Sequence, residues 1–412
     1  MSVWLRIVPF VAAAASLPNA GCDSAVALQG DGGEAEASLP PVADIVVGGW
    51  RDSDAPWTPP AGVDSCANFN WTFFDVIPAD DALYASWAWT VFEPLVAGPS
   101  DFLYGVVLRN SGSGWAEYFR SECSLEGGTD LGCQTTVERL LGTSSGGLVV
   151  RTWGDANHAL GVLDTSGVVL WPEEIWDVSD PFIVNDYLAY AVLGGTDSKV
   201  IRFDGAMWTP VADVLPDDLP YQLVWQLWAD EDDLWVAGDR GTVLSLGDPG
   251  WQVHALPTLD PITALWGSDG DDIWVADRGR DLFHWDGGTW QTVLWPNLAL
   301  EGGDACGEPS YIQGIWGTEG VLFFHTGRQF TRRDPSGEFT ALGYWPATAA
   351  EGAECIGGLR ITRLRGTSAT DVFLAAVEPS ARDRILEPGD DGENCASRPL
   401  VLLWDGASFR WI

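Results

Sequence analysis

Two neighbouring segments of the chain repeat one pattern of apolar and polar positions. Residues 226–252 and 264–291 each run from an apolar residue and Trp into an acidic turn, and then into Asp-Asp-apolar-Trp-Val-Ala. A Gly-containing turn, an apolar strand, a turn with Asp and Gly, and Trp-Gln complete both copies. Short apolar runs separated by turn residues are typical of β-strands. Each copy therefore predicts four short strands.

Weaker copies of this pattern extend over most of the chain. They cover residues 314–342, 363–374 with 402–411, 139–171, 187–208 and, most degenerately, about 82–120. The copies begin roughly 38 to 50 residues apart, which is the period of β-propeller blades. A four-stranded sheet of this size cannot bury both faces alone, whereas blades stacked in a ring bury them against each other. We therefore predict an all-β protein in which residues 45–412 form a single β-propeller of seven four-stranded blades.

The blade count depends on residues 45–81, whose pattern is ambiguous. One of its strands, residues 45–50 or 71–76, is expected to close the ring by completing the last blade, and six or eight blades stay open. A β-sandwich gives no reason for a repeating sequence, and the density of Gly, Asp and Pro excludes a helical solenoid. The large tryptophans of the repeats are predicted to fill the core: Trp228, Trp235, Trp266, Trp274, Trp285, Trp290 and Trp316.

The N-terminal segment predicts export. Residues 1–21 are typical of a signal peptide, because Arg6 precedes an apolar stretch that is too short to span a bilayer. Ala20-Gly21-Cys22 resembles the end of a bacterial lipobox, with Asn19 where that box has Leu, and predicts lipidation of Cys22. Cleavage by the ordinary signal peptidase is the alternative. Residues 22–44 are small, acidic and free of aromatics, which predicts a disordered tether. We expect a lipid-anchored protein of the cell envelope or outer surface of a Gram-negative bacterium.

The cysteines are consistent with export. Lipidation of Cys22 leaves six of the seven cysteines, an even number, and exported proteins form disulfides in an oxidising compartment. The predicted disulfide cysteines are Cys66, Cys123, Cys133, Cys306, Cys355 and Cys395. Cys123 and Cys133 are the expected pair because they lie in one loop. Cys306–Cys355 with Cys66–Cys395 is one arrangement of the rest, and buried free thiols are the alternative.

The two sharp copies resemble a broad family of Trp-rich bacterial propeller repeats that is common in exported lipoproteins. The resemblance rests on Trp266-Gly267, Asp272-Ile273-Trp274 and Trp285-Asp286-Gly287, with similar residues in the copy at 226–252. It implies the propeller fold and no single activity.

One turn also resembles the Asp box of sialidase-like propellers. This turn runs from Asp286 to Trp290, and related turns begin at Asp204, Asp248, Asp334 and Asp405. The resemblance implies that each Asp side chain caps the hairpin between the third and fourth strands of a blade. These aspartates are therefore expected to be structural, and no catalytic residue is predicted.

The charge of the chain restricts its partners. With 59 acidic against 21 basic residues, the net charge is −38. Long-range repulsion excludes nucleic acid and an anionic membrane surface, so the N-terminal lipid is the expected membrane contact. Protein or glycan partners remain, and we expect a monomer. No cofactor is predicted, although calcium stays open for the acidic turns at 230–233 and 269–272.

Propeller topology sorts the turns onto two faces. Turns between the second and third strands of a blade share one face with the connections between blades, here called the connection face. The remaining turns share the opposite hairpin face. The connection face receives long cysteine-bearing loops and four arginines: Arg240, Arg278, Arg280 and Arg328. We predict that these arginines rim the channel mouth and bind a carboxylate or sulfate, whereas pairing of each with a nearby acid is the alternative.

These observations predict a non-enzymatic binding module for protein or glycan. The first alternative is a carbohydrate-active enzyme, a sialidase-like hydrolase or a lyase, with its site on the same face. Tyr311 and Glu308 are available there as a nucleophile and a base. The second alternative is a structural envelope component without a discrete ligand.

Overall fold

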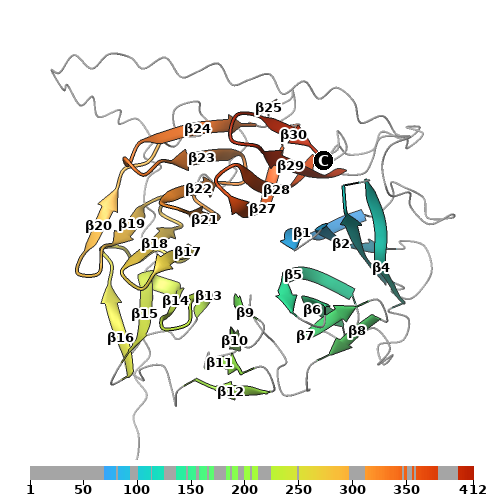
Figure 1. The fold of residues 1–412 in the computed structure, drawn as a ribbon, viewed down its shortest axis with the longest axis horizontal. Helices are drawn as coiled ribbons and strands as arrows, with labels where there is room; N and C mark the ends of the chain where they lie inside the picture. Colours follow the sequence, from blue (N-terminus) through green and yellow to red (C-terminus); the bar gives the residue numbers. More distant parts are fainter. Residues whose placement is uncertain are drawn as a thin grey trace, which may run out of the picture. The chain divides into compact units, whose positions relative to one another are not determined.

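The computed structural model describes much of the chain from Phe69 onward (Figure 1). The described residues are 69–79, 82–92, 101–112, 114–124, 136–144, 147–154, 157–164, 167–170, 182–185, 188–193, 199–204, 207–211, 224–247, 250–296, 311–345, 348–349, 355–356, 359–378 and 398–412. The chain divides into two units, Met1–Pro41 and Val42–Ile412, and all described residues belong to the second. The predictions for the signal peptide, the tether and Cys22 lie outside the described residues.

Seven antiparallel sheets of four strands make up this second unit, with the strands of each sheet in sequence order. The first three blades are β1 (Phe69–Ala79), β2 (Ala82–Phe92), β3 (Asp101–Asn110) and β4 (Trp115–Ser124); β5 (Thr136–Ser144), β6 (Gly147–Gly154), β7 (Asn157–Asp164) and β8 (Gly167–Leu170); and β9 (Phe182–Asn185), β10 (Leu188–Leu193), β11 (Lys199–Phe203) and β12 (Trp208–Pro210).

Blades 4 to 7 follow in the same way. They are β13 (Val224–Ala229), β14 (Leu234–Gly238), β15 (Thr242–Gly247) and β16 (Gly250–Ala255); β17 (Ile262–Asp269), β18 (Asp272–Asp277), β19 (Leu282–Trp285) and β20 (Trp290–Val293); β21 (Gly314–Thr318), β22 (Val321–His325), β23 (Gln329–Arg333) and β24 (Phe339–Tyr344); and β27 (Arg360–Ser368), β28 (Asp371–Glu378), β29 (Arg398–Trp404) and β30 (Phe409–Trp411). The predicted all-β fold of seven four-stranded blades is confirmed.

Few other elements occur in the described part of the chain. A two-stranded sheet pairs β25 (Thr348–Ala349) with β26 (Cys355–Ile356), and a 3₁₀ turn, η2, spans Asp239–Gly241. None of the described residues forms a helix that is long and apolar enough to cross a membrane.

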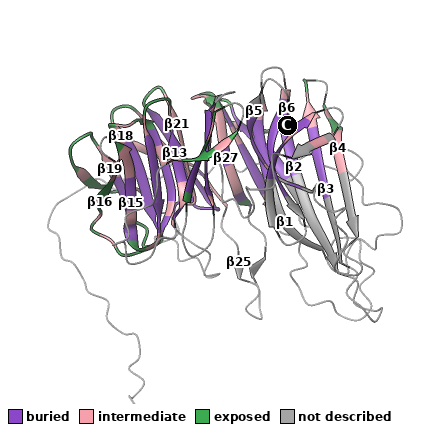
Figure 2. Cartoon of the chain, turned by 90° about the horizontal axis from the view of Figure 1, so that it is seen from below, coloured by how far each residue is buried: buried purple, intermediate pink, exposed green. Residues whose placement is uncertain are grey.

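The first strand of every blade lies at the centre of the ring (Figure 1). Around the ring, β1 contacts β5, β5 contacts β9, and the series continues through β13, β17, β21 and β27 back to β1. Seven clusters of buried residues lie between neighbouring blades, one for each of the seven interfaces. Figure 2 shows this burial along the strands, with exposed residues at the turns. Each large side chain buried in such a cluster contributes roughly 1.5–3 kcal/mol to stability.

The ring closes by packing between two complete blades. We expected residues 71–76 to complete the last blade, and this is wrong: they belong to β1, which begins a blade of its own, while the last blade takes all its strands from residues 360–411. A register shift between Trp71 and Phe73 breaks the alternation that would identify this strand. Closure instead rests on a shared apolar cluster and on Arg363, whose Nε lies 3.8 Å from Oδ2 of buried Asp75. Residues 45–50 lie outside the described part.

The repeated tryptophans are core residues, as predicted. Trp228, Trp235 and Trp274 are buried, with at most 4 % of their surface exposed. The other four are half-buried and pack against the clusters between blades: Trp266, Trp285, Trp290 and Trp316.

A glycine on the first strand of one blade receives a tryptophan ring from the blade before it. A methyl group added at Gly267 would lie 3.0 Å from the ring of Trp228, and one added at Gly317 would lie 2.8 Å from the ring of Trp266. Gly366 meets the ring of Trp316 in the same way. Neighbouring residues of a strand point to opposite faces. In a Trp-Gly pair, the Trp ring therefore packs on one neighbouring blade, and the glycine, which has no side chain, leaves room for the ring from the other. The repeated Trp-Gly pair is therefore the sequence signature of the interface.

We predict that Gly366→Ala destabilises the protein, because the three atoms nearest to the added methyl group all belong to the Trp316 ring, which it would overpack. The expected cost is about 1–3 kcal/mol in the free energy of unfolding, measured by urea denaturation. Gly288→Ala is the matched control, since a methyl group there would meet no atom closer than 3.7 Å. Equal stability of both variants would show that the ring contact does not limit the packing.

Candidate functional site

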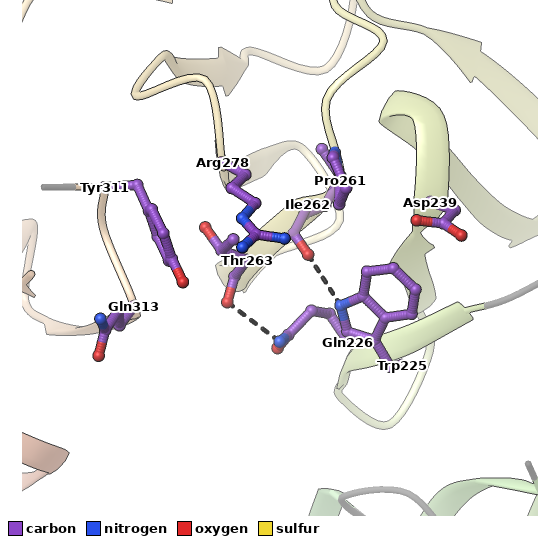
Figure 3. Close-up of a pocket in the computed structure, with 9 residues that line it drawn as sticks. All are labelled: Trp225, Gln226, Asp239, Pro261, Ile262, Thr263, Arg278, Tyr311 and Gln313. Carbon is purple, nitrogen blue, oxygen red and sulfur yellow. Dashed lines mark hydrogen bonds between the residues drawn. The ribbon is translucent and has the colours of Figure 1, made fainter. Parts of the chain in front are cut away.

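The clearest candidate site is a cavity of about 450 Å³ on the connection face, where blades 4, 5 and 6 meet (Figure 3). Two residues of β13 and two of β17 form its inner wall, and turns and connections supply the rest. The lining residues are Trp225, Gln226, Asp239, Pro261, Ile262, Thr263, Arg278, Tyr311 and Gln313.

Irregularities at the start of the inner strands turn two side chains toward the next blade. The pairing of β13 with β14 skips Trp225, and the pairing of β17 with β18 skips Thr263. Such an extra residue in one strand re-aims its side chain. The Trp225 indole Nε1 donates to the carbonyl oxygen of Ile262 at 2.8 Å, and Thr263 Oγ1 donates to that of Ile312 at 2.6 Å. The cavity wall is therefore held by hydrogen bonds between blades.

Gln226 adds a second bond between blades 4 and 5. Its Nε2 donates to the carbonyl oxygen of Thr263 at 3.0 Å, beside the Trp225 bond (Figure 3).

Deeper in blade 6, burial lowers the pKa of His325 to about 4, so this imidazole is neutral at physiological pH. His325 Nδ1 accepts the backbone N–H of Gly327 at 3.3 Å, and its carbonyl oxygen accepts that of Gln313 at 2.7 Å.

A rigid turn presents Arg278 to the cavity. Its backbone N–H donates to the carbonyl oxygen of Pro261 at 2.8 Å. The preceding Asp277 is fully buried and accepts hydrogen bonds from Thr258 Oγ1 at 2.6 Å and the backbone N–H of Asp281 at 2.8 Å. Burial raises the pKa of Asp277, and these two hydrogen bonds act against that rise.

The side chain of Arg278 lies between the Tyr311 ring and the Trp225 indole (Figure 3). It is exposed and makes no ion pair with any residue in the described part of the chain. A guanidinium group offers five N–H donors in a planar fork that matches a carboxylate. Together with the Tyr311 hydroxyl and the Gln313 amide, it gives the cavity the donors to hold an acidic or amide group.

The other three predicted arginines lie outside the cavity lining. Arg240 and Arg280 are exposed in the same turns of blades 4 and 5 that supply Asp239 and Arg278. Arg328 is buried, with 6 % of its surface exposed, and its Nη1 donates to the carbonyl oxygen of Trp345 at 3.4 Å. The structure thus brings three of the four arginines together on blades 4 and 5 and places the fourth inside blade 6. Their ligand-binding role stays a prediction.

The disulfide prediction falls mostly on residues outside the described part. Cys123 lies in β4 and Cys355 in β26, while the other predicted disulfide cysteines are not among the described residues. The three pairings and the lipid on Cys22 therefore stay predictions. Glu308, the base of the enzyme alternative, also lies outside the described residues, whereas Tyr311 lines the cavity.

Sequence reasoning missed lining residues that share one place in the repeat. Trp225, Thr263 and Gln313 each follow a buried apolar residue, two positions before the apolar-Trp pair of their repeat. A position-by-position alignment of the copies would have singled them out, because a variable residue there interrupts an otherwise apolar strand.

The Asp-containing turns of the hairpin face cap their hairpins, as the Asp-box resemblance implied. Asp286 Oδ1 accepts the backbone N–H groups of Gly288 at 3.1 Å and Thr289 at 2.8 Å. Equivalent bonds to the side-chain oxygen occur at Asp204, Asp334 and Asp405. Asp248 lies outside the described residues. These aspartates have a structural role that needs no ligand.

Two acidic turns of the same face adjoin each other. Asp233 packs against Gly270, and burial, followed by repulsion from Asp230, Asp232 and Asp271, raises the pKa of Asp233. Among the described residues no group of three or more His, Cys, Asp or Glu side chains is arranged to hold a metal ion. Calcium binding by these turns stays a prediction.

A polar network in blade 5 holds His284. The ring of His284 stacks on Trp274 with centroids 4.2 Å apart, and its Nε2 lies 2.7 Å from Asp272 Oδ1. Burial acts to raise the pKa of Asp272, but hydrogen bonds from His284, Ser268 and Trp274 outweigh it and hold the pKa below its ordinary value. His284 is therefore packed within the blade.

Comparisons with protein-family models and with curated proteins find no match. Solved structures share the fold at low identity. YCF48 from Cyanidioschyzon merolae is 12% identical, with a TM-score of 0.45 over 75% of this chain and 95% of that one. Chaetomium thermophilum Sqt1, bound to the N-terminus of the ribosomal protein L10, is 11% identical, with a TM-score of 0.48 over 76% and 97%. Saccharomyces cerevisiae Sqt1 is 9% identical, with a TM-score of 0.44 over 84% and 98%.

No inference rests on these likenesses, because every TM-score lies under 0.5 and the identities are 9–12%. By its own seven four-stranded sheets, the chain is a seven-bladed β-propeller.

The capped turns predict a loss of stability in acid. Backbone N–H groups of Thr289 and Gly288 lower the pKa of Asp286, the Ser336 hydroxyl lowers that of Asp334, and the backbone N–H groups of Ser408 and Ala407 lower that of Asp405. A carboxyl whose pKa is lower in the folded state stabilises the protein above its unfolded pKa. That contribution is lost as the pH falls through the folded pKa.

Replacing the three capping aspartates 286, 334 and 405 by Asn keeps the acceptor oxygens and removes the titration. The drop in Tm between about pH 5 and pH 3 should therefore be smaller in this variant than in the wild type, as measured by calorimetry. Glu319→Gln, on the same face and without a capping bond, should retain the wild-type slope. Identical slopes in all three proteins would contradict the assignment.

Proposed function

We propose that this protein is an exported, lipid-anchored β-propeller that binds another protein without catalysing a reaction. The cavity on the connection face is its binding site. The observation that carries the proposal is the guanidinium group of Arg278, exposed between Tyr311 and Trp225 and without an ion pair in the described part of the chain. A purely structural role gives no reason to hold such a group on a rigid turn beside an open cavity.

A polypeptide suits the donors and acceptors of the cavity. A carboxylate of the partner would bind the Arg278 fork, and its backbone amides would meet the Tyr311 hydroxyl and the Gln313 side chain. The wall behind these groups is already fixed by bonds between blades at Trp225 and Gln226, so little ordering is needed on binding.

The chemistry of the lining favours binding over glycoside cleavage. Tyr311 stands beside Arg278, as a sialidase-like site would require, but glycosidases use two carboxyl groups on either side of the scissile bond. Asp239 is the single carboxylate among the described lining residues. A protein partner is likewise proposed over a glycan because the Trp225 indole is half-buried and its N–H is already bonded, which limits its use as a stacking platform for sugars.

We predict that a photo-crosslinking amino acid in place of Tyr311 captures a discrete protein partner in cells. Arg278→Ala should reduce this crosslink about tenfold or more, because it removes a charge-assisted hydrogen bond. The control variant Arg202→Ala removes an exposed arginine of blade 3 and should leave the crosslink intact. A crosslink of equal strength in Arg278→Ala, or an adduct that resists protease and loses mass with glycosidase, would contradict the proposal.

The membrane anchor is tested separately at Cys22. In a Gram-negative host, Cys22→Ser should abolish labelling with radioactive palmitate and move the protein from the membrane fraction to the soluble fraction. Cys66→Ser is the matched control and should leave both properties unchanged. Membrane association that persists in Cys22→Ser would show that the lipid is not the anchor.

A further inference from the structure

An almost fully exposed leucine lies beside the cavity, in the connection between blades 4 and 5. Leu259 has 83 % of its surface exposed. Both of its chain neighbours are tied to adjacent turns: Thr258 Oγ1 donates to Asp277 Oδ2 at 2.6 Å, and the carbonyl oxygen of Asp260 accepts the backbone N–H of Gly241 at 2.9 Å. Leu259 is therefore held between the turn of blade 4 and the turn of blade 5.

These two turns carry three exposed arginines. Arg240 lies next to Gly241 in blade 4, and Arg278 and Arg280 follow Asp277 in blade 5. The Asp260 carboxylate lies directly over Gly279, between the last two arginines. Leu259 and these arginines thus form one surface, here called the Leu259 patch: Arg240, Leu259, Arg278 and Arg280.

The backbone of the patch is unusual at two arginines. Arg240 and Arg280 hold left-handed backbone conformations, with φ of 53° and 80°. Gly241 occupies the place in blade 4 that Arg280 occupies in blade 5, with φ of 66°, and glycine adopts this conformation without strain. Arg280 is fixed through its own backbone: its N–H donates to the carbonyl oxygen of Asp277 at 3.3 Å, and its carbonyl oxygen accepts the Trp295 indole N–H at 3.0 Å. The turn therefore holds the backbone of Arg280 in place while its side chain stays exposed.

The charges around the patch define how a ligand would be held. Three exposed or half-buried carboxylates stand near the three arginines: Asp239, Asp260 and Asp281. The patch is therefore close to neutral within a chain of net charge −38. At long range the chain as a whole repels an acidic ligand, so recognition would depend on short hydrogen bonds from the guanidinium groups.

We propose that the Leu259 patch binds an extended protein segment in which acidic residues flank a large apolar side chain. The apolar side chain packs on Leu259, and the carboxylates bind Arg278, Arg280 and Arg240. This inference rests on the proposed function and names the chemistry of the partner. A sulfated or uronic glycan would use the arginines, but the C–H face of a sugar ring packs best on a flat aromatic ring, and the patch offers the branched side chain of Leu259 instead.

The test is selection of random 12-residue peptides, displayed on bacteria, by the full-length protein carrying Cys22→Ser. Peptides are retained when they bind this protein and not its Arg278→Ala form. The selected peptides are then synthesised with a fluorescent label, and their Kd values are measured by anisotropy for each variant. We expect enriched sequences with Asp or Glu on both sides of Leu, Ile, Met or Phe.

Two variants separate the patch from the cavity. Arg280→Gly introduces the residue that blade 4 has at the equivalent position, Gly241. It removes the cation without straining the backbone, so Kd should rise about tenfold. Leu259→Ser removes the apolar contact, and Kd should rise about fivefold. The matched controls are Glu319→Gly, a left-handed residue of the hairpin face, and Met207→Ser, an apolar side chain that is 57 % exposed on that face. Both controls should leave Kd unchanged.

Peptides that lack the acidic and apolar pattern, or whose Kd is unchanged in Arg280→Gly and Leu259→Ser, would overturn this inference. The proposed function would stand in that case, since those peptides still depend on Arg278. If no peptide distinguishes the wild-type chain from Arg278→Ala, both the inference and protein binding at the cavity are wrong.

Discussion

The contact between a tryptophan ring of one blade and a glycine of the next is the constraint on which the rest of this propeller depends. Trp228 on Gly267, Trp266 on Gly317 and Trp316 on Gly366 repeat it across three successive interfaces. The glycine lets the first strand of a blade approach the ring closely, and the ring fills the widening space between two twisted sheets. Since a single four-stranded sheet has no core of its own, the seven interfaces between blades carry the burial that stabilises each blade, and the ring-on-glycine contact shapes those among blades 4 to 7. The closing interface uses other residues, with a shared apolar cluster and Arg363 beside Asp75.

This close approach of the first strands also builds the candidate site. When the inner strands lie side by side, an extra residue at the start of a strand reaches the backbone of the next blade, as Trp225 and Thr263 do. The turns on the connection face are then fixed by bonds to the incoming connections, such as that between Arg278 and Pro261. The cavity draws its lining from blades 4, 5 and 6, so no isolated blade could form it. The same close packing of the first strands therefore stabilises the ring and fixes the geometry of the cavity.

The sequence was most informative where the repeat is sharp. The fold, the number of strands in a blade, the tryptophan core and the caps at Asp286 and Asp405 all follow from residues whose physical role is local or periodic. The first blade was harder, because the register shift after Trp71 hides the strand alternation. Arg278 could be placed on the correct face from topology, but its partners in the cavity come from other blades and could not. Arg328 lies in the same type of turn, yet its surroundings bury it. The sequence of a turn does not show which of its side chains the neighbouring connection covers.

The most direct test of this account is a double-mutant cycle between Trp316 and Gly366, with the free energy of unfolding measured by urea denaturation. Trp316→Ala removes the ring that supplies the three atoms nearest to the methyl group of Gly366→Ala. We predict that Gly366→Ala costs at least about 1 kcal/mol less in the Trp316→Ala background than in the wild type, a coupling typical of residues in contact. Costs that add within about 0.5 kcal/mol would show that the two residues act independently. That result would contradict the ring-on-glycine contact as the basis of the propeller.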